Sequence, residues 1–281
     1  MSQQDPFSSP DWQALARESK LARQLLGNGA TALGTANYAD KKGDYYVAFF
    51  GLSIGIERLA KLILVADYAI ESGGKVPEQK IVSKFGHRLE ELLDAVETIE
   101  KKYTLALEFP RPVDDIAQSI VSCLDSFADA RRGRYANFDT LGDPNLKTEF
   151  EPIQKWWSEV AEAILARHFY GTKAEKGVRA RAQLFEAVMG PISMIRHTAE
   201  DGTPLTDIET ASYRTGATAY VQKYGRYYAL VIVRWLSDVF QVLTNYGCYT
   251  KDLDVLFGHY EHFQTYRVEN EFLKTRKRWP L

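Results

Sequence analysis

The stretch DYYVAFFGLSIGIERLAKLILVADYAIES, residues 44–72, decides the fold class of this chain. Ile56, Leu59 and Ile63 recur at intervals of three or four residues, which is the period of one face of an α-helix. Apolar residues also occupy the other faces of this stretch. We therefore predict a central helix, buried on several sides, rather than a peripheral one.

The same helical period recurs along most of the remaining chain. No stretch combines sustained apolar–polar alternation with enrichment in β-branched residues, which is the pattern of a strand. We therefore predict an all-α fold, a multi-helix bundle of about eight to ten helices. Proline and glycine signals predict breaks at residues 109–112 and 201–204, and a break or kink at Gly190-Pro191 within the helix expected at residues 182–198. The expected helices cover residues 9–26, 30–40, 44–72, 87–103, 114–132, 149–168, 182–198, 206–246 as one helix or two, and 251 to the C-terminus.

Three regions are expected along the chain. Residues 1–43 are predicted to form N-terminal helices, and residues 44–170 a helical core. Residues 171–281 are predicted to form a C-terminal helical region packed on that core. The boundary is placed at a charged stretch, residues 171–181, which also fits the start of the next helix.

Composition and charge are those of an ordinary soluble globular chain. Of 281 residues, 45% are apolar and 26% are charged, which is typical of a folded domain. Lys and Arg number 35 against 37 Asp and Glu, so the formal net charge is −2. A uniformly basic coat for nucleic acid is therefore excluded, whereas a local basic patch is compatible with that total.

The sequence carries no pattern of a membrane span or of a secretory leader. Its most apolar run, residues 45–56, is shorter than the roughly 20 apolar residues that cross a bilayer. The first ten residues are polar and lack a basic start followed by an apolar stretch. We therefore expect a cytoplasmic protein with no membrane partner.

Few residues have the spacing of a metal, cofactor or nucleophile site. Cys123 and Cys248 are too few for a disulfide scaffold, a four-thiolate zinc site or an iron–sulfur cluster, and we expect buried free thiols. His259 and His262 share one helix face, but zinc needs at least one more ligand. Gly-rich phosphate loops and a Gly-x-Ser-x-Gly elbow are absent from the sequence. We predict no metal and no cofactor.

The most informative candidate site follows the helix expected at residues 114–132. Arginine side chains clamp phosphates with paired hydrogen bonds, a tyrosine ring stacks on a base, and an amide reads base edges. The alternative is structural, because cations stabilise a helix C-terminus and aromatic rings fill a core. The predicted nucleic-acid contacts are Arg131, Arg132, Arg134, Tyr135 and Asn137.

A second basic and aromatic stripe lies within residues 206–246. It fits a strip for single-stranded nucleic acid, and it also fits a core face with arginines reaching the surface at its edges. We favour the core. The basic residues 274–278 are interpreted as a solvated tail. The stripe comprises Tyr220, Tyr224, Tyr227 and Tyr228 with Arg214, Lys223, Arg226 and Arg234.

Two segments together resemble the HEPN domains. GLSIGIERLAK, residues 51–61, resembles the first core helix of that family, which carries an apolar-Glu-x-Leu-x-Lys pattern. FGHRLEELL, residues 85–93, resembles the next helix, with its Gly-His-x-Leu-x-x-Leu start. The resemblance covers about residues 44–168. We interpret Glu57 and Lys61, which match the pattern, as an i,i+4 ion pair.

The resemblance implies a fold and a chemistry. HEPN proteins are small helical bundles, usually dimeric, and many are metal-independent ribonucleases of toxin–antitoxin and antiphage systems. Their Arg-x(4–6)-His motif binds the scissile phosphate through the arginine and uses the histidine in acid–base chemistry. No arginine here has a histidine at that spacing, and Asp139 stands at that distance from Arg134. His87, the third match to the family pattern, is interpreted as a packed or capping residue.

We therefore expect a HEPN-like core with additional C-terminal helices, in a homodimer that acts as an RNA-binding or regulatory subunit of a bacterial defence or stress system. One alternative is a degenerate metal-independent ribonuclease with Arg134 and His87 as catalytic candidates. The other is a protein–protein interaction module without a ligand, which exposed apolar residues at 49–50 or 156–157 would favour. RNA and a protein are the expected partners.

Overall fold

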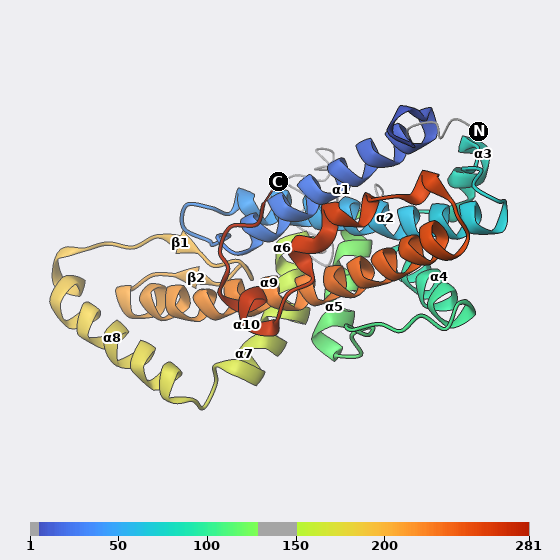
Figure 1. Cartoon of the computed structure of the whole chain (residues 1–281). Helices are drawn as coiled ribbons and strands as arrows, with labels where there is room; N and C mark the ends of the chain where they lie inside the picture. The colour runs from blue at the N-terminus through green and yellow to red at the C-terminus, as the bar shows by residue number, and fades with distance from the viewer. Residues whose placement is uncertain (1–5, 129–150, 281) are drawn as a thin grey trace, which may run out of the picture.

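The computed structural model describes residues 6–128 and 151–280. Within these ranges the chain folds into ten α-helices and one two-stranded ribbon (Figure 1), which confirms the predicted all-α multi-helix bundle. The ribbon pairs β1 (His197–Thr198) with β2 (Pro204–Leu205) in antiparallel orientation. The helices are α1 (Pro10–Leu33), α2 (Gly43–Glu71), α3 (Gln79–Val82), α4 (Leu89–Lys102), α5 (Asp115–Ala128), α6 (Pro152–Trp156), α7 (Glu162–His168), α8 (Lys173–Met189), α9 (Ile208–Asn245) and α10 (Asn270–Thr275).

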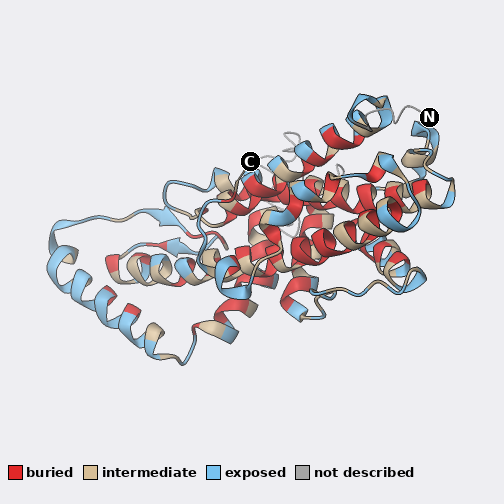
Figure 2. Cartoon of the chain, viewed as in Figure 1, coloured by how far each residue is buried: buried red, intermediate tan, exposed pale blue. Residues whose placement is uncertain are grey.

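The two longest helices, α2 and α9, run through the middle of the bundle, where the buried residues of Figure 2 concentrate. Ile56, Leu59 and Ile63 are completely buried, which confirms the predicted central helix. One continuous apolar core contains residues from all three expected regions. The division of the chain at residues 43 and 170 stays a prediction.

The backbones of α1 and α2 touch at two glycines. A Cβ atom on Gly51 would lie 2.7 Å from the carbonyl oxygen of Leu25, and one on Gly29 would lie 2.7 Å from the backbone nitrogen of Leu52. Because glycine serves helix packing at this crossing, it does not end the first helix. The end predicted at residue 26 and the separate helix expected after it are both wrong, since α1 continues unbroken to its last residue, Leu33.

The α9 helix runs for 38 residues without a break, although two glycines interrupt its pattern. Arg226 and Arg234 are buried on it, and they donate hydrogen bonds to the carbonyl oxygens of Lys274 (3.0 Å) and Val268 (2.9 Å). These bonds attach the C-terminal segment to α9. The tyrosine stripe faces the core as predicted, buried or half-buried at Tyr220, Tyr224, Tyr227 and Tyr228.

The helix predicted at residues 182–198 breaks after Met189, at the position where Gly190 and Pro191 predicted a break or kink, because Pro191 cannot donate the next helical hydrogen bond. The helical residues expected after that break are wrong, since residues 197–198 form β1. The chain then enters the β1–β2 ribbon, whose turn lies at the break predicted for residues 201–204. The helix predicted from residue 251 is also wrong. Gly258 adopts a left-handed conformation (φ 75°), 3₁₀ turns follow, and only α10 is α-helical there.

The apolar pairs that would favour an interaction module are mostly internal. Phe49, Trp156 and Trp157 are buried, and only Phe50 of the four is exposed. They therefore give no support to an apolar dimer face. Among the described residues, no helix has the length and apolar content needed to cross a membrane.

Candidate functional site

An exposed histidine lies against a largely buried carboxylate where α2 meets the start of α4. His87 Nδ1 lies 2.9 Å from Glu57 Oε1, and Lys61 Nζ lies 2.8 Å from the same oxygen. The His87 side chain is 80% exposed, whereas Glu57 and Lys61 are 14% and 16% exposed. Because a carboxylate only accepts, Nδ1 carries the proton of this bond, and Nε2 is the ring nitrogen left for a ligand. We call these three side chains the His87 cluster.

Local structure explains how the cluster forms. The α2 helix places Glu57 and Lys61 one turn apart, so the predicted i,i+4 ion pair is confirmed. Gly86 has a φ of 79°, which side chains other than glycine rarely tolerate, and this turn delivers His87 to α2. The predicted packed or capping role of His87 is wrong. Its ring is exposed, and the N-cap position of α4 is held by Arg88.

The C-terminal part of α5 lies beside this cluster. Asp125 Oδ1 accepts a 2.7 Å hydrogen bond from the backbone N–H of Leu89, so a carboxylate from α5 caps α4. Asp125 Oδ2 also lies 3.7 Å from Arg88 Nε. Sequence reasoning missed Asp125, because a cap supplied from 36 residues away leaves no local signal.

The predicted nucleic-acid contacts fall outside the residues that the structure describes. These residues are Arg131, Arg132, Arg134, Tyr135 and Asn137.

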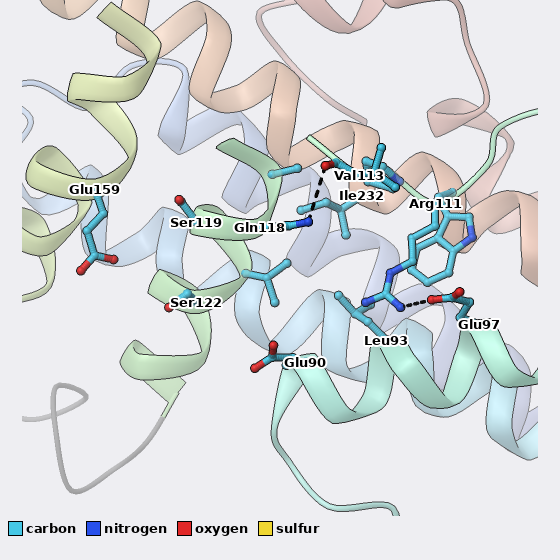
Figure 3. Close-up of a pocket in the computed structure, with 14 residues that line it drawn as sticks. Glu90, Leu93, Glu97, Arg111, Val113, Gln118, Ser119, Ser122, Glu159 and Ile232 are labelled. Atoms are coloured by element: carbon cyan, nitrogen blue, oxygen red, sulfur yellow. Dashed lines mark hydrogen bonds and ion pairs between the residues drawn. The ribbon is translucent and has the colours of Figure 1, made fainter. Parts of the chain in front are cut away.

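A separate cavity of about 860 Å³ opens between α4 and α5 (Figure 3). Ile232 and Trp235 of α9 supply part of its apolar wall. The guanidinium of Arg111 lies 5.4 Å from the centre of the Trp235 ring, within the range of a cation–π contact. Sequence analysis treated this arginine only as part of a proline-rich break.

The charge of the cavity is unfavourable for nucleic acid. Its lining includes the carboxylates of Glu90, Glu97 and Glu159. Arg111 is its one basic lining residue in the described part of the chain, and it is already ion-paired with Glu97 and Asp94. Because such a lining repels phosphate, the cavity does not belong to an RNA surface.

The other histidine and cysteine candidates have structural surroundings. Burial lowers the pKa of His259 to about 4, and its Nε2 donates to the carbonyl oxygen of Val255 (3.0 Å). Cys123 is a buried free thiol, as predicted, and burial raises its pKa to about 12. Cys248 is half-buried rather than buried. No cluster of three or more His, Cys, Asp or Glu residues suited to a metal ion occurs in the described ranges.

Comparison with known proteins adds no relative to this picture. No protein-family model, no curated protein and no solved structure matches the chain. The HEPN-like core stays a prediction that rests on two short motifs, and the function is argued from the His87 cluster itself.

Proposed function

We propose that this chain is an RNA-binding protein with a HEPN-like core, and that the His87 cluster is part of its RNA contact surface. The observation that carries the proposal is the exposed His87 ring held against Glu57, with Lys61 on the same carboxylate oxygen. A fixed imidazole nitrogen beside an ammonium group suits the ribose hydroxyls and phosphates of a single strand.

The surroundings of the cluster support this proposal. Lys84 and Arg88 are exposed cations three residues before and one residue after His87, and Arg88 is also ion-paired with Glu91 and Asp125. The arginine-rich residues 131–134 follow α5, whose Asp125 is bonded to the first residue of α4. A local basic patch of this kind is compatible with a net charge of −2, because phosphate contacts act over short range at physiological salt.

The HEPN resemblance gives the proposal its biological setting. On that basis the protein acts as a regulatory subunit in a bacterial defence or stress system, in the cytoplasm and as a homodimer. RNA is its first partner and a second protein its other partner.

A second candidate function, metal-independent RNA cleavage, is favoured by one feature of the same cluster. A carboxylate that accepts from Nδ1 orients an imidazole for acid–base work through Nε2. His87 would take the proton of a ribose 2′-hydroxyl, whose oxygen attacks the adjacent phosphorus to form a 2′,3′-cyclic phosphate. The bond from phosphorus to the 5′-oxygen of the next nucleotide would break, and that oxygen would leave with a proton from solvent, while Arg134 would bind the phosphate. This route needs no Arg-x(4–6)-His motif, since the histidine comes from another segment.

A gel assay with labelled single-stranded RNA, followed over time at low and moderate salt, tests both candidates. RNA binding predicts a salt-sensitive shifted band without shorter products. Cleavage predicts products that disappear in His87→Ala and persist in His197→Ala, a matched exposed histidine on β1. If the protein neither shifts nor cleaves RNA, both candidates are wrong.

A further inference from the structure

An arm made of α8 and the first half of α9 projects from one end of the bundle (Figure 1). Val178 and Ala182 are the only buried residues of α8, and Val178 packs against α9 opposite Gly216. Figure 2 shows exposed residues along nearly all of the helix. One side of α8 is therefore attached to α9, and the other side faces outward.

The outer end of this arm is strongly apolar. Its large apolar side chains occupy the last turns of α8 and the 3₁₀ turn and extended residues that follow. Large exposed apolar side chains gathered within one short segment mark an interaction site rather than ordinary scatter. We call this set the α8 tip: Leu184 (65% exposed), Phe185 (59%), Val188 (63%), Met189 (38%), Ile192 (77%) and Met194 (89%).

Positive charge lies along α8 and on either side of the α8 tip in sequence. Both carboxylates of α8 are bonded toward the bundle. Glu175 accepts from the hydroxyl of Tyr213, and Glu186 accepts from the backbone N–H groups of Ile208 and Glu209. Four exposed cations along the same segment form no ion pair with any described residue: Lys173, Lys176, Arg181 and Arg196.

We propose that the α8 tip binds the surface of an anionic lipid bilayer. A helix with an apolar face and unpaired lysines and arginines inserts that face at the headgroup boundary, while its cations meet anionic headgroups. The tip lies at the end of a projecting arm, and the deformable acyl region accepts such a convex apolar surface. This contact departs from the expectation of no membrane partner, because surface binding needs no spanning segment.

A second copy of the chain matches this surface poorly. A twofold interface places the same patch against itself. In a parallel pair of α8 helices, Lys173 and Lys176 would face the same cations of the partner copy. In an antiparallel pair that overlaps along the whole of α8, those cations would lie against the apolar Val188 and Ile192 and lose their hydration. An anionic bilayer surface matches both halves of α8, because its headgroups carry negative charge for the cations and its acyl chains receive the apolar tip.

Co-sedimentation of the full chain with lipid vesicles tests the proposal. We expect the protein to sediment with vesicles of equal parts phosphatidylcholine and phosphatidylglycerol, less at high salt, and to stay in solution with phosphatidylcholine alone. The double variant Val188→Glu/Ile192→Glu should lower the partition coefficient by at least about tenfold. The matched control Tyr249→Glu/Phe272→Glu, at exposed apolar sites elsewhere, should leave it unchanged.

Several outcomes would overturn the proposal. These are no binding to the mixed vesicles, equal binding of the tip variant, or a doubled mass in light scattering that only the tip variant abolishes. A doubled mass that only the tip variant abolishes would assign the α8 tip to contact with a second copy of the chain. No binding to the mixed vesicles would leave an acidic protein surface as the partner of the tip.

A second measurement tests the proposal without the double variant, in case that variant fails to fold. Met194→Cys, in a Cys248→Ser background, can carry an environment-sensitive dye, since Cys123 is buried. Its emission should shift to the blue with mixed vesicles only, and an unshifted spectrum contradicts insertion.

Discussion

His87 and Glu57, thirty residues apart in sequence, meet through a 2.9 Å bond between Nδ1 and Oε1. The bond places a proton on Nδ1, and Nε2 is the ring nitrogen left for a ligand. Lys61 holds the same oxygen at 2.8 Å, so the carboxylate is also held by a residue of its own helix. The candidate site is therefore preorganised at the carboxylate and exposed at the imidazole, the arrangement that a surface ligand requires.

The hydrogen bond that caps α4 should contribute measurably to the free energy of unfolding. Asp125→Ala removes the acceptor for the backbone N–H of Leu89, and we expect a loss of about 1 kcal/mol in the free energy of unfolding. Asp125→Asn keeps a capping oxygen and should retain most of that stability. Urea unfolding of the three proteins checks this, and an alanine variant as stable as wild type would contradict it.

The crossing of α1 and α2 should not tolerate a methyl group. Gly51→Ala places a Cβ 2.7 Å from the Leu25 carbonyl oxygen and forces the helices apart, at a cost of about 1–3 kcal/mol. Gly177→Ala is the control, because a Cβ there meets nothing within 4 Å and should add up to about 1 kcal/mol. Opposite shifts in melting temperature are expected, and equal shifts would show that the crossing is not tightly packed.

The buried carboxylate of Asp238 should be essential for stability. It is completely buried, and it accepts hydrogen bonds from the backbone N–H of Phe109 (2.7 Å) and from Arg267 Nε (3.0 Å). Asp238→Ala leaves both donors unpaired and should cost about 3–5 kcal/mol. Glu91→Ala removes an exposed ion pair with Arg88 and should cost at most about 0.5 kcal/mol. Denaturant titration that ranks the two variants the other way would refute this.

Acid should destabilise the protein through His259. Burial lowers its pKa in the folded state to about 4, from 6.5 when unfolded. Unfolding therefore binds a proton between these values, so the stability present above pH 6.5 is lost as pH falls toward 4, on the order of 3 kcal/mol in all. His259→Gln keeps a donor for the Val255 carbonyl but does not titrate. Urea unfolding at pH 7 and pH 5 should show a smaller loss in the variant, and parallel losses would exclude His259 as the cause.

The sequence alone was sufficient to predict a helix where one periodic pattern of apolar residues determines how that helix packs. Residues 44–72 predicted α2 almost to the residue, since most of its apolar positions are buried in the core, with Tyr46, Val47 and Phe50 as exposed exceptions. Glycine was ambiguous, because Gly29 carries the same local signal as a helix end and is needed here for contact with α2. The C-terminal segment failed for a similar reason. Its irregular turns are held by buried arginines of α9, a tertiary effect without local pattern.

One part of the candidate site could be predicted from the sequence, and the other part could not. The Glu57–Lys61 pair follows from helical spacing and was predicted. The exposure of His87 and the cap from Asp125 depend on how α2, α4 and α5 are placed, which periodicity does not specify. The predicted arginine contacts at residues 131–134 stay predictions, because they lie outside the described ranges.

Fluorescence anisotropy of labelled single-stranded RNA tests the central claim most directly. The pair Lys84→Glu/Arg88→Glu reverses the exposed cations that flank His87, while Lys173→Glu/Lys176→Glu makes the same charge change on α8. We predict that the first pair raises Kd at least about tenfold and lowers the salt slope by about two, because two phosphate contacts are lost, while the second pair binds as wild type. Equal weakening by both pairs, or by neither, would contradict RNA binding at the His87 cluster.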